Sequence, residues 1–164
     1  VHSLKISENI MLEIEENLLL YKLPKARSID GDSIHEDQKE AMKNEEINIR
    51  VRKAVDLCYS MKEQLIRGDL KDFGSSLDTA WKLKSQFSTK ISNSEIDSIY
   101  KYAIKNGALG GKLLGAGGGG FFLFYVNPLD KHFFKKAMKE RDLKAKDFLF
   151  VENGMQSWTI RDKD

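Results

Sequence analysis

Residues 110–126 read GGKLLGAGGGGFFLFYV and hold seven of the chain's twelve glycines, followed at once by large apolar residues. Residues 121–126 predict a buried strand. Glycine loses more backbone entropy on folding than any other residue, so four in succession at 117–120 need a reason. A simple bend needs only one or two. Consecutive N–H groups without side chains form a concave surface that suits an anion, so the run favours ligand contact over a plain bend.

Three familiar glycine patterns do not fit this stretch. Gly115-x-Gly117-x-x-Gly120 matches the letters of the dinucleotide fingerprint. That motif follows a strand and opens a helix, whereas we expect a helix before these glycines and a strand after them. A phosphate-binding Walker A loop requires Ser or Thr after Gly111-Lys112, where this chain has Leu113. A small-residue packing motif of a transmembrane helix does not fit either, because the uncharged stretch 113–129 is short for a bilayer span.

The composition is that of a globular protein. The chain has 164 residues, enough for one domain, with 41% hydrophobic and 32% charged side chains. The net charge is only +2 and no basic block interleaves with aromatics, so we expect no nucleic-acid partner. No segment predicts membrane association. The single cysteine, Cys58, excludes an internal disulfide and suits a reducing compartment, and we expect a cytoplasmic protein.

Residues with metal or nucleophilic chemistry form no recognisable site. His2, His35 and His132 lack metal-ligand or triad spacing, so we expect no metal site in this chain. Cys58 falls on the apolar stripe of a predicted helix and is expected in the core rather than as a nucleophile.

Helical and strand periodicities alternate along the chain. We predict helices from Ser7, over 33–67, from 70 to 87, from 94 to 106 and over 128–141, and strands over 17–22, 121–126, 148–151 and 155–160. Asn153-Gly154 predicts a tight turn between the last two strands. Together these elements predict an α+β fold, in which an antiparallel sheet of about four strands is covered by helices on one face.

Residues 106–126 closely resemble the third signature motif of the GHMP kinases. Within this family the resemblance is closest to the D-glycero-D-manno-heptose phosphate kinases. It extends over nearly the whole chain, through segments that occur in the same order: Ser7-x-x-Ile10, Glu13-x-Glu15-x-Asn17-LLLY, Gln38, Asp72-Phe73-Gly74, Ala80-Trp81-x-x-Lys84 and Ile91-Ser92-Asn93 with Ile96-Asp97. The resemblance implies the family's ferredoxin-like C-terminal domain over residues 1–164, as a single domain.

The resemblance also implies what this chain does not carry. GHMP kinases are about twice this length, and their ATP-binding glycine-serine loop, magnesium ligands and catalytic acidic residue lie in an N-terminal domain that is absent here. We therefore expect ATP and Mg²⁺ as cofactors of the complete enzyme, with no Mg²⁺ ligands in this chain. The expected partners are ATP, a sugar phosphate and the missing N-terminal domain, and the catalytic residues are unknown.

Site residues follow from the resemblance position by position. The loop that faces the triphosphate corresponds to Gly115, Ala116, Gly117, Gly118, Gly119 and Gly120. Candidates for the sugar-phosphate side are Lys112, Lys84, Trp81 and Arg27. Each of the first three has an ordinary alternative, since Lys112 and Lys84 could be solvated lysines and Trp81 a core residue.

Two departures leave the sugar substrate open. Relatives follow the first strand with T-G-x-S-R-x-S, of which this chain retains only Arg27-Ser28, and Leu77-Asp78 stands where relatives tend to have histidine. The expected reaction is transfer of the γ-phosphate of ATP to a sugar hydroxyl, with a heptose phosphate as the expected acceptor. The chain alone is expected to be inactive. The alternative is a detached, non-catalytic module that binds a metabolite or a partner.

Overall fold

The computed structural model describes residues 4–23, 31–151, 154–155 and 157–158. Its centre is a four-stranded antiparallel sheet in the order β2-β3-β1-β4. The strands are β1 (Leu18–Lys22), β2 (Ala108–Leu113), β3 (Phe121–Val126) and β4 (Ala145–Lys146). This strand order, with helices between β1 and β2 and between β3 and β4, is that of a ferredoxin-like fold. The predicted fold class is therefore confirmed.

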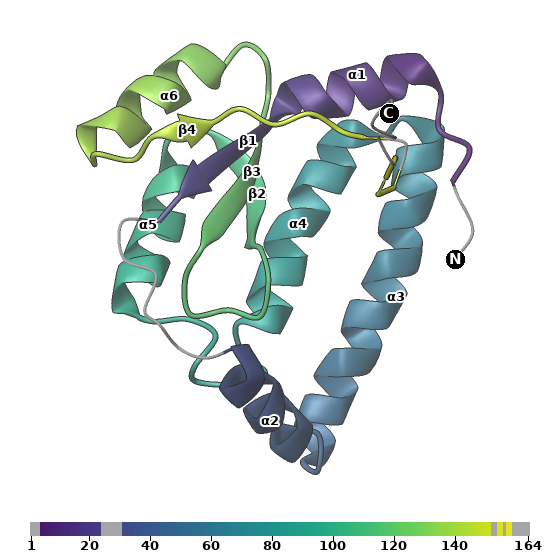
Figure 1. The fold of residues 1–164 in the computed structure, drawn as a ribbon, viewed down its shortest axis with the longest axis vertical. Coiled ribbons are helices and arrows are strands. Elements are labelled where there is room, and N and C mark those ends of the chain that lie inside the picture. The colour runs from purple at the N-terminus through teal and green to yellow at the C-terminus, as the bar shows by residue number, and fades with distance from the viewer. Residues whose placement is uncertain (1–3, 24–30, 152–153, 156, 159–164) are drawn as a thin grey trace, which may run out of the picture.

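Six helices surround the sheet in the described part of the chain (Figure 1). They are α1 (Glu8–Asn17), α2 (Gly31–Ala41), α3 (Glu45–Arg67), α4 (Leu70–Lys84), α5 (Ser94–Lys105) and α6 (Lys131–Glu140). Polar side chains cap the starts of α1, α3 and α5. The Ser7 hydroxyl accepts a hydrogen bond from the Ile10 N–H at 3.4 Å, and the Asn93 side chain accepts two from the first turn of α5.

Helices cover both faces of the sheet, which corrects the prediction that they cover one. Along β3, Phe122, Phe124 and Val126 join the core cluster that includes α5 and α6, whereas Leu123 and Tyr125 join a second cluster with residues of α1, α3 and α4. Figure 1 shows α5 and α6 on one side of the sheet and α3 and α4 on the other. Because neighbouring strand residues point to opposite faces, a strand that is apolar throughout is buried on both.

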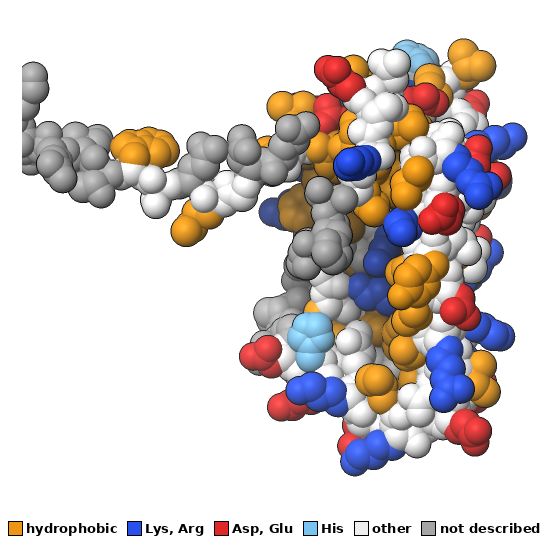
Figure 2. Space-filling model, turned by 90° about the vertical axis from the view of Figure 1, so that its right-hand side faces the viewer, with side chains coloured by type: hydrophobic (Ala, Val, Ile, Leu, Met, Phe, Trp, Pro, Cys, Tyr) orange, Lys and Arg blue, Asp and Glu red, His pale blue; other side chains and the backbone are white. Residues whose placement is uncertain are grey.

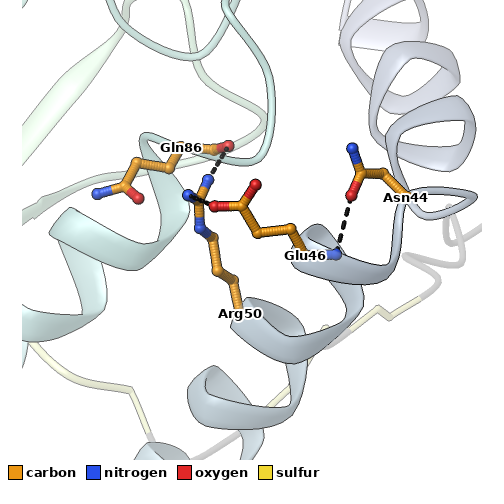
Figure 3. A network of polar contacts seen from close by, with 4 residues as sticks. All are labelled: Asn44, Glu46, Arg50 and Gln86. Carbon is orange, nitrogen blue, oxygen red and sulfur yellow. Dashed lines mark hydrogen bonds and ion pairs between the residues drawn. The ribbon is translucent and has the colours of Figure 1, made fainter.

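The predicted helix over 33–67 is two helices. Residues 42–44 form a turn, and the Asn44 side chain accepts a hydrogen bond from the Glu46 N–H at 2.8 Å, so that α3 begins anew (Figure 3). Arg50 strengthens this start, because its guanidinium pairs with Glu46 at 2.5 Å and donates to the Gln86 carbonyl at 3.5 Å. Because the Asn44 side chain caps the first turn of α3, the preceding helix α2 ends before this residue.

The element before the glycine loop is the strand β2, not the predicted helix. Its sequence, Ala-Leu-Gly-Gly-Lys-Leu, shows no clear alternation. A side chain at Gly110 would lie 2.2 Å from the Gly74 carbonyl oxygen and 2.5 Å from the Asp78 nitrogen, both on α4. Glycine here lets α4 pack directly against the strand. The dinucleotide fingerprint remains excluded, since a strand rather than a helix follows the loop.

The predicted C-terminal strands do not form where they were expected. Residues 148–151 are irregular, and the last strand, β4, precedes them and pairs with Leu20 and Tyr21. Residues 154–155 and 157–158 are also outside any strand, and the rest of the predicted 155–160 strand, with Asn153 of the turn, lies outside the described residues. The Phe150 N–H instead bonds to the Glu15 carboxylate at 2.8 Å.

Helix α3 is covered on only one side. None of its residues is buried, and its outer apolar side chains include Val55 and Tyr59, which are 49% and 67% exposed. Figure 2, viewed from the right-hand side of Figure 1, shows hydrophobic side chains running down this face between charged ones. Cys58 is exposed, so its predicted place in the core is wrong. The helices that the structure describes include none with the length and hydropathy needed to cross a membrane.

Candidate phosphate-binding site

The glycine loop, residues 114–120, joins β2 to β3 and is fixed to two other segments of the chain. At its base the Leu114 N–H donates to the Phe121 carbonyl at 2.8 Å. The Gly120 carbonyl accepts from the Leu23 N–H, just after β1, at 2.9 Å, and the Gly118 N–H donates to the Ile91 carbonyl at 2.9 Å. The loop is thus a defined structure rather than a loose connection.

The loop needs glycine for its conformation. All five of its glycines have positive φ angles, which L-residues rarely adopt: Gly115 (79°), Gly117 (135°), Gly118 (73°), Gly119 (156°) and Gly120 (105°). A side chain at Gly117 would lie 2.8 Å from the Ile91 Cα. At Gly115 and Gly120 it would meet nothing within 4 Å. Those two glycines therefore leave open space beside the backbone.

The backbone of this loop offers hydrogen-bond donors to a ligand. Within the described part of the chain, the N–H groups of Gly117, Gly119 and Gly120 make no hydrogen bond to protein, whereas that of Gly118 is used internally. Ala116 packs against the main core cluster and anchors the middle of the loop. Free N–H groups in such a loop can donate hydrogen bonds to the oxygens of a phosphate without a side chain in the way.

Lys84, at the end of α4, contacts the start of the loop. Its ammonium donates to the Leu113 carbonyl at 3.4 Å and to the Gly115 carbonyl at 2.5 Å. Burial, and secondarily the positive charge of Lys112, lowers the pKa of Lys84 to about 8. Lys84 is therefore occupied by the loop itself, which differs from both sequence-based alternatives, a solvated lysine and a direct phosphate ligand.

The other predicted substrate-side residues have different surroundings. Lys112 lies on β2, partly exposed and opposite Leu123, and its charge acts on Lys84. Trp81 is only 3% exposed and packs edge-on against Phe122 with a ring separation of 5.4 Å, so it is a core residue. Arg27 lies outside the described residues. The structure thus brings Lys84 and Lys112 together at the loop, whereas Trp81 lies in the core.

The segment that carries Ile91 supports the glycine loop, a role that the sequence did not predict for it. Ile91 is fully buried and contacts the loop through the Gly118 hydrogen bond. The preceding residue, Lys90, donates to Ser33 at 3.0 Å and to Asp37 at 2.9 Å, which connects this turn to α2. The Ile91-Ser92-Asn93 match was the sequence signal for this contact. Among the described residues, no group of three or more His, Cys, Asp and Glu side chains is placed to hold a metal ion.

Comparison with known proteins gives this site its family. The family model for the C-terminal domain of GHMP kinases matches residues 61–143, which include Lys84 and the whole glycine loop. The D-glycero-alpha-D-manno-heptose 7-phosphate kinase of Campylobacter jejuni is 34% identical over 160 residues, which cover 98% of this chain and 47% of that protein. The chain therefore spans about half the length of this relative.

Solved structures share the fold. A crystal structure of a candidate sugar kinase from Campylobacter jejuni superposes with a TM-score of 0.61 at 32% identity, covering 97% of this chain and 44% of the other. A D-glycero-D-manno-heptose 1-phosphate kinase from Bacteroides thetaiotaomicron gives a TM-score of 0.65 at 22% identity, covering 99% and 42%. The chain, with this fold and this glycine loop, belongs to the GHMP kinase family and contains its C-terminal domain.

Proposed function

We propose that this chain is the C-terminal part of an ATP-dependent sugar kinase that transfers the γ-phosphate of ATP to a hydroxyl of a phosphorylated heptose. The single observation that carries the proposal is the glycine loop, in which the N–H groups of Gly117, Gly119 and Gly120 make no hydrogen bond within the described part of the chain and open space lies beside Gly115 and Gly120. The similarity to heptose phosphate kinases over almost the whole chain supports the choice of sugar.

The loop suits one part of phosphoryl transfer, the stabilisation of negative charge. In this reaction positioning and electrostatics do most of the catalytic work. Because Ile91 and Leu23 hold the loop in place, its free backbone N–H groups, which carry partial positive charge, need no reorganisation when a triphosphate arrives. Lys112 adds a full positive charge on the adjacent strand. Unlike the ammonium of Lys84, that of Lys112 makes no hydrogen bond to the loop in the described part of the chain.

The complete enzyme also needs Mg²⁺, which neutralises phosphate charge when bound with ATP and is held by one or two carboxylates. On the likeness to GHMP kinases about twice this length, we propose that the Mg²⁺ ligands and the catalytic acid lie in an N-terminal domain of the complete enzyme, together with most contacts to the nucleotide. A cytoplasmic location, where ATP is available, fits this function.

The second candidate function is a non-catalytic module that binds a metabolite or a partner chain. It is favoured by the same free N–H groups of the glycine loop, which can bind an anionic metabolite without a catalytic residue. A coding sequence for a glycine-serine nucleotide loop, upstream in the same frame or in a separate subunit, would favour the kinase over the module.

Phosphate transfer from labelled ATP tests the proposal. Two proteins are compared: the 164-residue chain, and the same chain fused behind the N-terminal half of the Campylobacter jejuni relative. The acceptors are D-glycero-D-manno-heptose 7-phosphate and 1-phosphate, with galactose as a control sugar. We expect transfer to a heptose phosphate by the fusion and none by the chain alone.

Loop variants show whether transfer depends on this site. Gly120→Ala places a methyl group at a φ of 105° without a clash in the surrounding space, so the fold should survive while the loop geometry changes. We expect this variant of the fusion to lose activity by about 100-fold, the scale of one lost backbone donor to developing charge. Transfer by the chain alone, or a folded fusion that binds ATP and phosphorylates no heptose phosphate, would contradict the proposal.

A further inference from the structure

The loop is held by one side chain as well as by backbone. Of the hydrogen bonds that reach residues 113–120 from elsewhere in the described structure, those from Leu23 and to Ile91 involve only main-chain atoms. The exception is Lys84, which donates to the carbonyls of Leu113 and Gly115. These two carbonyls lie at the point where β2 ends and the positive-φ glycines begin.

We propose that Lys84 is a positioning residue, whose ammonium draws in the first carbonyls of the glycine loop and thereby turns the following N–H groups toward the ligand. A peptide unit has its carbonyl and its N–H on opposite sides, so fixing the Gly115 carbonyl fixes where the Ala116 N–H points. The next residues follow through Gly117, whose backbone is pressed against Ile91. Lys84 thus acts on the phosphate through the loop.

The role of Lys84 in the fold differs from its role in the loop. Burial and Lys112 disfavour its charged form, as the pKa of about 8 shows, so the fold as a whole gains little from this ammonium. A half-buried lysine beside a second lysine does not stabilise the fold through its charge. The two carbonyl contacts are the interactions that its charge does make, and both belong to the loop.

The matched lysine is Lys82, two residues earlier on α4. Its ammonium pairs with Asp78 at 2.6 Å, its side chain is 66% exposed, and it makes no hydrogen bond to the loop among the described residues. Lys82→Met removes a positive charge from the same helix. Lys84→Met removes one while keeping an unbranched apolar chain of similar length. A comparison of the two variants therefore isolates the carbonyl contacts.

Amide hydrogen exchange of Gly118 tests the proposal, because its N–H is bonded to the Ile91 carbonyl at 2.9 Å and reports whether the loop stays closed. In the unliganded 164-residue chain, we expect Lys84→Met to lower Gly118 protection by about tenfold, the value of a lost charged hydrogen bond. Lys82→Met should leave it unchanged. Lys84→Arg, which keeps cationic donors, should retain most of the protection.

Global stability, from urea unfolding of the same variants, separates positioning from general support. We expect Lys84→Met to unfold at the same urea concentration as the parent or a higher one, since a buried charge is removed. Gly118 protection within about twofold of the parent would overturn the proposal, since local opening then does not depend on Lys84. A loss of global stability equal to the loss of local protection would overturn it as well.

The idea that Lys84 positions the loop for a phosphate rests on the proposed function. Hydrogen exchange measured without nucleotide tests only whether Lys84 fixes the loop. A fusion that fails to phosphorylate any sugar, combined with the expected Gly118 result, removes the proposed function and leaves the role of Lys84 intact. The reverse combination removes only the role of Lys84.

Discussion

At the scale of single residues, the glycines of 110–120 fall into two groups with different physical causes. Gly110 has no room for a side chain because α4 packs against it. The glycines from Gly115 onward have positive φ angles, and at Gly117 a side chain would also lack space. The stretch therefore combines close packing before the loop with an unusual backbone within it. A substitution should destabilise the fold by a steric clash at Gly110 and by backbone strain within the loop.

Gly115→Ala and Gly117→Ala separate conformation from space. Gly115 has a φ of 79° and open surroundings, so alanine there should cost about 1 kcal/mol of unfolding free energy. Gly117 has a φ of 135° and a would-be side chain 2.8 Å from the Ile91 Cα, so alanine should cost about 3 kcal/mol. Urea unfolding of both variants measures the difference. Equal costs would mean that Ile91 does not confine the loop.

Tyr21 supplies a residue-level test that depends on pH. Its hydroxyl is buried without a hydrogen-bond partner among the described residues, and burial raises its pKa to about 12. Because the unfolded chain releases this proton near pH 10, stability should fall between pH 10 and pH 12 as the unfolded state binds fewer protons. Tyr21→Phe should make that fall smaller, the remainder coming from Tyr100 and Tyr125, whose pKa values burial also raises, and should leave stability at pH 7 unchanged or higher. Urea midpoints across this pH range would show it, and an identical fall in both proteins would contradict it.

At the scale of elements, the sequence predicted those parts whose signal is local. Residues 121–126 form β3 as predicted, the predicted strand over 17–22 forms β1 from Leu18 onward, and Ser7 caps α1 as expected. The strand β2 was missed because Gly110 packs against α4 and Gly111 against Leu123 and Phe124 of β3, contacts that no local pattern shows. The break at Asn44 was missed because neither glycine nor proline marks it, and the cap is a single side-chain hydrogen bond to the Glu46 N–H. The chain after β4 was wrongly predicted as strands, because alternating apolar residues form a strand only where a partner strand pairs with them.

Gly110→Ala tests the packing of α4 on β2. Its methyl group would lie 2.2 Å from the Gly74 carbonyl oxygen, which is main chain and cannot rotate away. The helix must move from the strand, so we expect a loss of unfolding free energy of about 4 kcal/mol or more, the range of severe overpacking. The control is Lys112→Ala on the same strand, with a partly exposed side chain, for which about 0.5 kcal/mol is expected. Similar midpoints for both variants would place the close contact elsewhere.

At the scale of the whole molecule, the sheet is covered on both faces, yet α3 remains open to solvent on its outer side. That 23-residue helix has no buried residue, although its apolar stripe is as regular as that of a core helix. The stripe made Cys58 look like a core residue, since a sequence pattern shows which face is apolar and not what covers it. The candidate site shows the same limit. The glycine loop was predictable from its letters, but the contact of Lys84 with its carbonyls required the fold.

Thiol labelling checks the exposure of Cys58 in the folded chain. An aromatic disulfide reagent should modify it in the native protein at a rate close to that in urea, because no unfolding is needed to reach the sulfur. Tyr59→Ser, at an exposed neighbouring position, should not change that rate. Modification that proceeds only at the rate of global unfolding would place Cys58 in the core after all.

The central claim is that the bare backbone of residues 115–120 receives the phosphates of a nucleotide. A ¹H–¹⁵N titration of the chain with ATP, with inorganic tripolyphosphate and with adenosine tests it most directly. We predict saturable shifts of the Gly117, Gly119 and Gly120 amides with ATP and tripolyphosphate, and none with adenosine, since their N–H groups make no hydrogen bond within the described part of the chain. Loop amides that stay in place while others shift, or that respond to adenosine as strongly as to tripolyphosphate, would contradict the claim.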